Sequence, residues 1–462
     1  MGQYLIDALR DGLPAEVVVD DPDRVESFRF DKAQFCPAGI PAAVVLVRER
    51  AHVEHTLRTA SRLGVPVVPQ GARSGLSGAA NAIDGCVVLS LERMDHIVEI
   101  DPANRIAVVE PGVFNAVLSR AVGEHGLFYP PDPSSWEFCT IGGNLATNSG
   151  GLCCVKYGVT TDYVRGLEVV LASGEVVTTG RRTVKGVAGY DLTKLFVGSE
   201  GTLGVITQAT LGLRPETERP RTIGALFDSP ASAAAAVSAV MAAGHVPSLL
   251  EIMDATCIRA VDDMKRMDLP ADAGAMLLAQ SDRGPAAAEE IAAIGDLFRH
   301  AGATDVVEAV DPAEGELLLE ARRVVLLALE RLGTTLIDDV CVPLSRLSDL
   351  FEGVEKIAAT HGVLIGVVGH AGDGNMHPTV VFDASDEAAV RLAQRAYGAV
   401  MELSLELGGT ITGEHGVGVL KKPWLAAEIG PVGMRLHRDI KRVLDPQDIL
   451  NPGKVFDVAE PG

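Results

Sequence analysis

Four side chains that could hold a metal ion and accept a proton lie in two glycine-rich segments of the chain. His370 and His377 flank the run AGDGNM, and the later segment GEHG adds Glu414 and His415. Glycine permits tight turns, so both imidazoles of the first segment can point to one side. Two imidazoles and one carboxylate leave coordination positions open, which is typical of catalytic rather than structural metal sites. The pattern therefore predicts a metal centre with a third imidazole beside it.

A histidine by itself is more often a hydrogen-bonded core or loop residue than a ligand. We apply this interpretation to the histidines outside the two segments, because none of them has comparable neighbours. They are His52, His55, His96, His125, His245, His300, His361 and His437.

The elements around the histidine segments follow an α/β pattern. The buried-looking strand at residues 363–368 leads into His370. From residue 222 onward, apolar strands alternate with alanine-rich amphipathic helices. The sequence predicts strands at 223–227 and 249–253 and helices at 231–243 and 387–407.

The first half of the chain has a mixed pattern of helices and hairpins. We expect a helix at 51–63, a loop over VPVVPQGARSGLSG, a strand at 86–90, a helix at 113–125 and a strand at 203–208. Two hairpins are predicted, 97–100 with 106–109 and 167–172 with 175–179, because turn-forming residues separate each pair. The run PETERPRT reads as a linker between the halves. A last helix is expected from residue 431, followed by the segment DPQDILNPGK.

Four glycine-rich loops stand in the first half. They are PQGARSGLSG, TIGGN with its continuation NSGG, KYG, and GSEGTLGVI. Glycines let backbone N–H groups converge on an anion, and a diphosphate suits such a nest. None of the four fits GxGxxG at a strand–helix junction or GxxxxGK[ST], which argues against a Rossmann NAD site and a P-loop.

Composition excludes several classes of protein. The chain of 462 residues carries a net charge of −22, which disfavours nucleic-acid and anionic-membrane partners. No apolar run approaches the roughly 18 residues that span a bilayer, and the N-terminus lacks a signal-peptide pattern, so a cytoplasmic location is expected. The seven cysteines form no CxxC pair or iron–sulfur run. Any iron–sulfur centres would therefore belong to another chain.

Seven segments, in the same order along the chain, resemble those of a known flavoprotein family. They are PQGARSGLSG, TIGGNLATNSGG, VKYG, GSEGTLGVIT, GHAGDGNMHPTV, GEHGVG and DPQDILNPGK. The family has the FAD-binding fold of the vanillyl-alcohol-oxidase and p-cresol-methylhydroxylase type. The branch that the chain resembles contains D-lactate dehydrogenase, the FAD subunit of glycolate oxidase and D-2-hydroxyglutarate dehydrogenase.

The resemblance implies an α+β protein with a division into domains. An N-terminal lead-in (1–41) precedes a two-subdomain FAD-binding domain (42–216). A substrate or cap domain with a mainly antiparallel sheet and the metal site follows (217–430). The C-terminal segment (431–462) then returns to the FAD-binding domain.

The resemblance also implies which residues bind FAD. The diphosphate region would contact the first loop, the flavin would contact the second and third loops with Asn375 and Asn451, and the adenosine end would contact the fourth loop. The first loop has Arg73 and Ser74 and no His or Cys, so FAD is expected to be non-covalent. The implied residues are Pro69, Gly71, Ser74, Gly75, Leu76, Ser77, Gly78, Gly143, Asn144, Asn148, Ser149, Gly150, Gly158, Glu200, Gly204, Ile206, Asn375 and Asn451.

In the same family the histidine segments form the substrate side of the site. The resemblance assigns His370, His377 and Glu414 to a divalent metal, zinc or manganese, and makes His415 the general base. A metal lowers the pKa of a bound hydroxyl, and a neutral imidazole can then take the proton. Asp373 would support the metal ligands or contact the flavin.

The substrate's carboxylate needs a cation, and arginine offers a two-pronged donor. The family carries an arginine ahead of the strand that leads to a Val-Pro pair, here Val342-Pro343, so the resemblance makes Arg322 and Arg323 the candidates. We favour Arg322, although a solvated helix residue is the alternative for each. Leu319 or Glu320 stands where relatives have an aromatic residue near this arginine.

The far wall of the pocket limits the choice of substrate. The D-2-hydroxyglutarate branch has a lysine where this chain has Ile337 or Asp338, which disfavours a dicarboxylate. The expected substrate is D-lactate, then glycolate or a 2-hydroxy acid with an apolar tail. The acceptor of electrons would be a quinone, a cytochrome or an electron-transfer flavoprotein, with oxygen less favoured. Rival hypotheses are a glycolate oxidase subunit with iron–sulfur partners, a non-catalytic flavin- and metal-binding protein, and a zinc hydrolase.

Overall fold

The computed structural model describes residues 2–270 and 272–458, and by contact the chain divides into two units. Unit 1 comprises residues 1–150, 159–216 and 414–462, and unit 2 comprises residues 151–158 and 217–413. The chain passes into unit 2 within the predicted linker, after Glu216. It returns to unit 1 at Glu414, before the expected boundary at residue 431, because residues 417–420 hydrogen-bond to Glu200 and Ser77 of unit 1.

A small sheet of unit 1 is buried on both faces. Alternate residues of its strands contribute to two different apolar clusters, with Val45 and Leu89 in one and Val44 and Val88 in the other. Such double burial explains why these strands read as continuous apolar runs rather than alternating ones. Strands β2, β4 and β3 are parallel, and β1 is antiparallel to β2. In sheet order the strands are β1 (Val18–Val19), β2 (Ala43–Leu46), β4 (Val87–Ser90) and β3 (Val67–Gln70).

Strand β3 corrects one expectation. The segment VPVVPQGARSGLSG was expected to be a loop throughout, but residues 67–70 pair with β4 along their length. Pro69 is tolerated because β3 lies at the edge of the sheet, where one side of a strand needs no ladder partner. The loop proper begins at Gly71, directly after the strand.

The second sheet of unit 1 is antiparallel and contains both predicted hairpins, β5–β6 and β8–β9. Strand β10 joins the hairpins by pairing with β6 and β8. In sheet order the strands are β5 (Ile97–Asp101), β6 (Ile106–Val109), β10 (Val205–Gly212), β8 (Val164–Val170) and β9 (Val176–Gly180); β7 (Leu127–Phe128) and β11 (Arg214–Pro215) form a separate pair.

The helices of unit 1 surround these sheets, and α3 ends where Gly64 adopts a left-handed conformation. The last helix, α16, begins at Lys422 rather than at the expected residue 431, and it is kinked at Gly430 before Pro431. Proline removes a helical hydrogen bond, which explains why the sequence predicted only the second half. The helices are α1 (Gly2–Arg10), α2 (Pro22–Glu26), α3 (Arg50–Leu63), α4 (Asn115–Gly123), α5 (Ile141–Thr147), α7 (Thr160–Tyr163), α8 (Leu192–Phe196) and α16 (Lys422–Leu444).

Unit 2 is built on one large sheet in which every strand pair is antiparallel. Its inner strand β14 is buried at every residue, so both faces of the sheet are covered there. In sheet order the strands are β15 (Asp305–Glu308), β12 (Arg221–Phe227), β14 (Ala275–Ser281), β13 (Leu249–Asp254), β18 (Leu364–His370), β19 (Asn375–Phe382) and β16 (Thr334–Ile337), with β17 (Val340–Cys341) also on β19.

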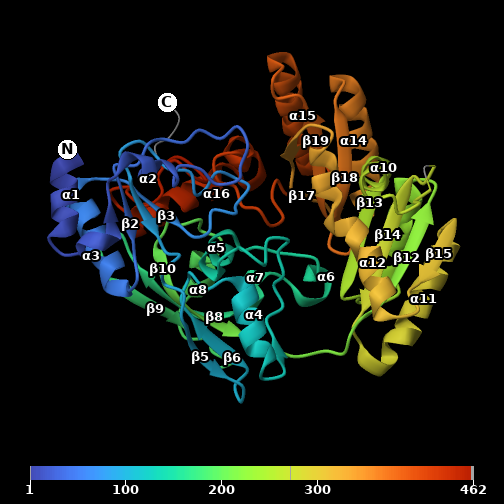
Figure 1. Cartoon of the computed structure of the whole chain (residues 1–462), viewed down its shortest axis with the longest axis horizontal. Helices are drawn as coiled ribbons and strands as arrows, with labels where there is room; N and C mark the ends of the chain where they lie inside the picture. The colour runs from blue at the N-terminus through green and yellow to red at the C-terminus, as the bar shows by residue number, and fades with distance from the viewer. Residues whose placement is uncertain (1, 271, 459–462) are drawn as a thin grey trace. The chain divides into compact units, whose positions relative to one another are not determined.

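Helices of unit 2 pack on this sheet, and the long helices α14 and α15 run side by side (Figure 1). Asp386 caps the N-terminus of α15, and Ser229 followed by Pro230 starts α9. The helices are α6 (Cys154–Tyr157), α9 (Pro230–Ala242), α10 (Ala255–Lys265), α11 (Ala287–His300), α12 (Pro312–Arg323), α13 (Val325–Glu330), α14 (Leu347–His361) and α15 (Glu387–Glu406).

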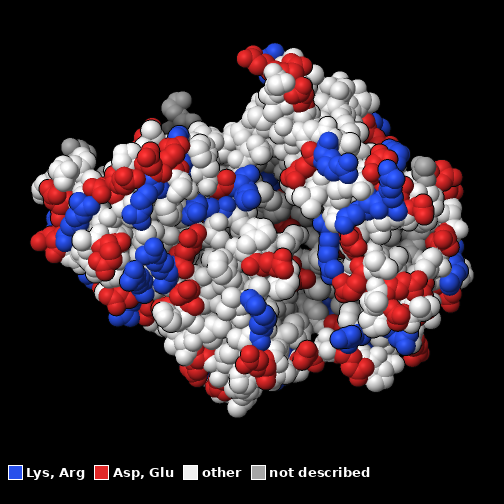
Figure 2. Space-filling view, in the orientation of Figure 1, with Lys and Arg blue, Asp and Glu red and all other residues white. Residues whose placement is uncertain are grey.

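Charged side chains of both signs are interspersed on the face of the molecule shown in Figure 2. Among the described helices, none combines the length and the apolar character needed to cross a bilayer.

Candidate active site

A cleft in unit 1 brings three of the four glycine-rich loops together. It has 1360 Å³ of space between protein atoms, counting open solvent at its mouth. Glu414 and His415 also contribute to its lining. Of the residues predicted to bind FAD, those that line the cleft are Pro69, Gly71, Ser74, Gly75, Leu76, Ser77, Gly143, Asn144, Ser149, Glu200, Gly204 and Ile206.

The first loop offers its backbone to the cleft. In the described part of the chain, the N–H groups of residues 71–77 donate no hydrogen bond to another protein group. Arg73 has a left-handed conformation with a φ of 53°, and the hydroxyl of Ser77 is buried with no protein partner among the described residues. Unpaired donors on a strained loop are what a phosphate-binding nest requires. The cleft therefore fits the diphosphate of a dinucleotide.

The first and second loops touch closely at a glycine. A Cβ atom on Gly71 would lie 2.3 Å from Oγ1 of Thr140, so a larger residue would push the loops apart. Thr140 is the N-cap of α5, and its hydroxyl accepts a hydrogen bond from the N–H of Gly143 at 3.3 Å. The two loops thus form one continuous wall of the cleft.

The other predicted cofactor residues lie outside this lining. Gly78, Asn148, Gly150 and Asn451 belong to unit 1, whereas Gly158 and Asn375 belong to unit 2. The buried amide of Asn451 donates to the carbonyls of Ala79 and Glu200 at 3.0 and 2.7 Å, and thereby connects the first and fourth loops.

In unit 2, the hairpin β18–β19 places His370 and His377 on one face. Val368 is the register partner of His377, and His370 follows Val368 by two residues, so all three side chains point the same way. The two imidazole rings are 5.2 Å apart between centroids, and both are buried. The turn between the strands, residues 371–374, contains the glycines that the sequence pattern predicted to allow this arrangement.

A buried carboxylate that sequence reasoning missed holds His370. Glu251 of β13 is the register partner of His370, and its Oε1 lies 2.7 Å from Nδ1 of the imidazole. Its other oxygen accepts a hydrogen bond from Nε of Arg322 at 2.6 Å. Burial raises the pKa of the Glu251 carboxyl, but His370 and Arg322 outweigh this effect, so the pKa lies below its usual value. The sequence signal was a lone charge in the apolar strand LLEIM.

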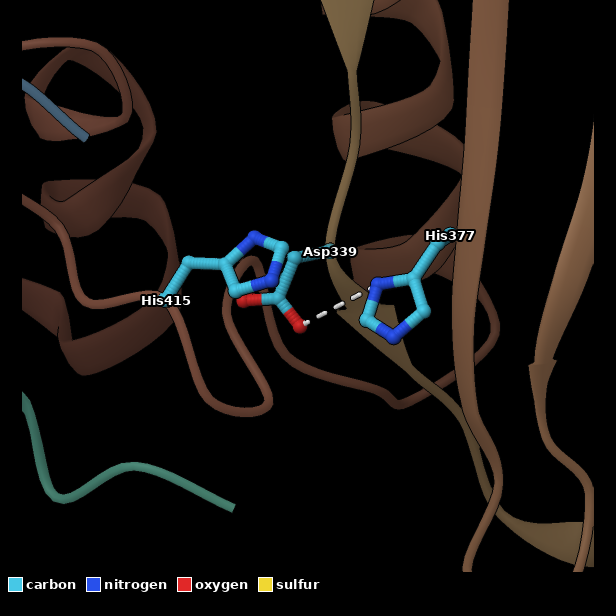
Figure 3. Close-up of side chains that lie close together, drawn as sticks. All are labelled: Asp339, His377 and His415. Atoms are coloured by element: carbon cyan, nitrogen blue, oxygen red, sulfur yellow. Dashed lines mark ion pairs between the residues drawn. The ribbon is translucent and has the colours of Figure 1, made fainter. Parts of the chain in front are cut away.

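The second carboxylate that sequence reasoning missed stands beside His377. Oδ1 of the fully buried Asp339 lies 3.9 Å from Nδ1 of His377 (Figure 3). Oδ2 of Asp339 accepts hydrogen bonds from the hydroxyl of Thr412 at 2.8 Å and from the N–H of Gly413 at 3.1 Å. Glu414 and His415 follow Gly413 directly in the chain, so Asp339 anchors the segment that leads into them.

The two candidate arginines differ in their surroundings. Arg322 is buried in the contact with Glu251, whereas Arg323 is exposed and pairs with Glu316 at 2.7 Å. This difference favours Arg322 for a role inside unit 2. Near it, Leu319 is buried and Glu320 pairs with Lys265 at the surface.

Of the two residues that were predicted to limit the substrate, Ile337 is partly buried and Asp338 is fully buried. Within unit 1, Oε1 of Glu414 lies 3.6 Å from Nε2 of His415. In the turn of the first histidine segment, the N–H of Asn375 donates to Asp373 at 3.1 Å.

Comparisons with known proteins support the same interpretation of the chain. Residues 41–180 match the family described as "FAD binding domain", and residues 216–455 match "FAD linked oxidases, C-terminal domain". The chain is 43% identical to the "Glycolate oxidase subunit GlcD" of Bacillus subtilis (strain 168), over 90% of this chain and 89% of the relative. It is 34% identical to the "D-lactate dehydrogenase" of Anaerostipes hadrus, over 98% of this chain and 97% of the relative.

The fold matches solved structures as well. A crystal structure of p-cresol methylhydroxylase with substrate bound superposes with a TM-score of 0.83 at 18% identity, covering all of this chain and 98% of the other. This likeness confirms the predicted fold of the vanillyl-alcohol-oxidase type. With the two family matches and the two relatives, it places the chain among flavin enzymes: the protein belongs to the family of FAD-linked oxidases and is an FAD-linked oxidoreductase.

Proposed function

We propose that the protein oxidises a D-2-hydroxy acid, preferably D-lactate, to the 2-oxo acid. One observation carries the proposal: His415 and Glu414 line the same cleft of unit 1 as the glycine-rich loops that fit a dinucleotide. A proton acceptor at the wall of a flavin cleft is the arrangement that oxidation of an alcohol requires, because the hydroxyl proton must leave as hydride departs from carbon.

The residues of the chain divide the remaining tasks. His415 would take the hydroxyl proton. Arg322 would hold the substrate's carboxylate, since a guanidinium has five N–H donors and Glu251 engages Nε. Bound FAD would supply the hydride acceptor.

We further propose that His370, His377 and Glu414 hold a divalent cation, zinc or manganese. The two buried imidazoles lie side by side in unit 2, and Glu414 follows the residue that Asp339 anchors there. Such a cation would lower the pKa of the substrate's hydroxyl by several units, as it does for bound water. Glu251 would fix the orientation of the His370 ring through Nδ1, as the carboxylate partners of metal-ligating histidines do.

The choice of D-lactate over a dicarboxylate is supported by the apolar and acidic side chains at Ile337 and Asp338. An apolar or acidic side chain would not stabilise a second carboxylate on the substrate. The similar proteins named D-lactate dehydrogenase and glycolate oxidase subunit are in keeping with a small monocarboxylate.

An anaerobic flavin-reduction screen tests the proposed function. The FAD-loaded protein is mixed with D-lactate, L-lactate, glycolate and D-2-hydroxyglutarate, and flavin absorbance is followed. We expect D-lactate to bleach the flavin fastest and its enantiomer to bleach it at least about tenfold more slowly, a discrimination of ~1.4 kcal/mol. A flavin that no 2-hydroxy acid bleaches would contradict the proposal.

A second candidate is the catalytic subunit of a glycolate oxidase. The 43% identity to the Bacillus subtilis subunit of that name favours it. Glycolate would then bleach the flavin faster than D-lactate in the same screen, and partner subunits with iron–sulfur centres would take the electrons. With D-lactate as substrate, the proposed acceptor is a quinone, a cytochrome or an electron-transfer flavoprotein.

Replacing Glu251 should weaken the metal site without emptying the flavin site. The variant Glu251→Gln keeps a hydrogen-bond acceptor but loses the charge behind His370, so metal affinity is expected to fall about 10- to 100-fold. Competition with a chromophoric chelator measures the affinity, and flavin absorbance measures FAD content.

Glu290→Gln is the matched control for this variant. Glu290 is also a buried glutamate of unit 2 with a histidine, His245, and an arginine, Arg283, as ion-pair partners. Equal loss of metal affinity in both variants would show that Glu251 acts only through the stability of unit 2.

A further inference from the structure

A carboxylate of the fourth glycine-rich loop accepts hydrogen bonds from the segment that contains His415. Oε1 of Glu200 accepts a hydrogen bond from the N–H of Val417 at 2.7 Å, and Oε2 accepts one from Gly418 at 2.8 Å. Two consecutive backbone donors on one carboxylate fix both the position and the direction of the chain. The first of these two hydrogen bonds is made two residues after His415.

Further backbone hydrogen bonds hold the residues that follow His415. The N–H groups of Val419 and Leu420 both donate to the carbonyl of Ser77, at 2.9 and 3.0 Å, and Val455 donates to the carbonyl of Gly418 at 2.8 Å. A Cβ atom on Gly418 would lie 2.1 Å from the oxygen of Ser77, and its φ is +52°, so only glycine fits this approach. The segment after His415 is thus hydrogen-bonded to both the first and the fourth glycine-rich loops.

Glu200 itself has an unusual environment. It is 5% exposed and adopts a left-handed conformation with a φ of 51°. Burial raises its pKa to about 7, although the N–H groups of Val417 and Gly418 and the charges of Lys421 and Lys454 lower it. A strained, buried carboxylate is costly to keep, and such strain is concentrated where geometry serves function.

We propose that Glu200 is a positioning residue. Its carboxylate fixes the backbone of residues 415–418 and thereby the position of the His415 imidazole at the flavin cleft. The inference deepens the proposed function, because it rests on His415 as the proton acceptor. It also gives Glu200 a task other than the adenosine contact that the resemblance implies. A displacement of the base by about 1 Å would cost about 100-fold in rate.

The test uses FAD-loaded protein and five chains: wild type, Glu200→Gln, Glu200→Asp, His415→Ala and the double variant that combines Glu200→Gln with His415→Ala. In Glu200→Gln, the amide of glutamine can accept at one atom only, so one of the two N–H groups loses its partner. We expect flavin reduction by D-lactate to slow about 10- to 100-fold at unchanged FAD content, with little change in the apparent affinity for D-lactate. Glu200→Asp, which keeps the charge, should recover part of the rate.

The double variant decides whether Glu200 acts through His415. With the base removed, Glu200→Gln should slow reduction no further, because nothing is left to position. Equal slowing in both backgrounds would overturn the proposal. Loss of FAD affinity with an unchanged rate in the loaded fraction would also overturn it, and would instead support the adenosine contact.

Hydrogen exchange separates this proposal from the proposed function. At least one of the amides of Val417 and Gly418 in Glu200→Gln, and both amides in the shorter Glu200→Asp, should exchange at least about tenfold faster than in wild type, whatever the substrate turns out to be. Asp445→Asn is the matched control, because Asp445 is a buried carboxylate of unit 1 that accepts from two consecutive N–H groups, those of Ile449 and Leu450. It should leave exchange at Val417 and Gly418 unchanged. Unchanged exchange in both Glu200 variants would show that the Glu200 carboxylate does not hold residues 417 and 418 in place, even if D-lactate reduces the flavin.

Discussion

Flavin reduction by D-lactate is expected to become about 10²- to 10⁴-fold slower in His415→Ala than in wild type, while FAD remains bound. The loss is the contribution of a positioned general base, which alanine cannot replace. FAD should remain bound because the cleft is built mainly from the glycine-rich loops, and His415 stands at its wall together with Glu414. Anaerobic stopped-flow measurement of flavin absorbance gives the rate, and the spectrum before mixing gives FAD content.

His437→Ala is the control for this variant. His437 also belongs to unit 1, but it lies on the exposed surface of α16, where its Nδ1 is 2.9 Å from the carbonyl of Gly433. Reduction should proceed at the wild-type rate. Rapid bleaching in His415→Ala would remove this imidazole from the reaction.

Removal of the proposed divalent metal should slow flavin reduction by a similar factor. A Lewis acid on a reacting oxygen contributes several kcal/mol to transition-state stabilisation, or about 10²- to 10⁴-fold in rate. We expect dialysis against a chelator to slow D-lactate oxidation by this factor, and zinc or manganese to restore the rate. His370→Ala and His377→Ala should show the same loss without restoration, because each removes a proposed ligand.

Metal analysis of the dialysed protein accompanies the rate measurements. His245→Ala, which alters a histidine of unit 2 that pairs with Glu290, should keep both metal and activity. A chelated protein that contains no metal and still reduces its flavin at full rate would refute the metal-assisted step. Oxidation would then depend on His415 and Arg322 alone.

Sequence reasoning predicted much of the fold because the strongest signals are local. The helix at 51–63 and the two hairpins are set by apolar periodicity and by turn residues within a few positions. Strand β3 escaped because Pro69 and the glycines after it are typical of loops, and only pairing with β4 makes residues 67–70 extended. The first half of α16 escaped because Gly430 and Pro431 normally end a helix.

The candidate site divides in the same way. The histidine and glycine segments could be found because several unusual residues stand together in the sequence. Glu251 and Asp339 could not be found in this way, because neither acidic residue belongs to a sequence motif. Glu251 meets His370 only through the pairing of β13 with β18, across 119 positions. The hydrogen bonds that the N–H groups of Val417 and Gly418 donate to Glu200 span 217 and 218 positions, so no window of sequence contains them.

The return of residues 414–462 to unit 1 has a consequence for how the chain emerges from the ribosome. Asn451 closes the contact between the first and fourth loops by binding the carbonyl of Ala79, 372 positions earlier. Until Asn451 has been translated, the first part of unit 1 lacks this tie. It also lacks the proposed base, His415, until that residue has been made. Contacts so distant in sequence form late and slowly. We therefore expect nascent chains that stop before Glu414 to require chaperones and to bind FAD weakly, even though they already contain all four glycine-rich loops.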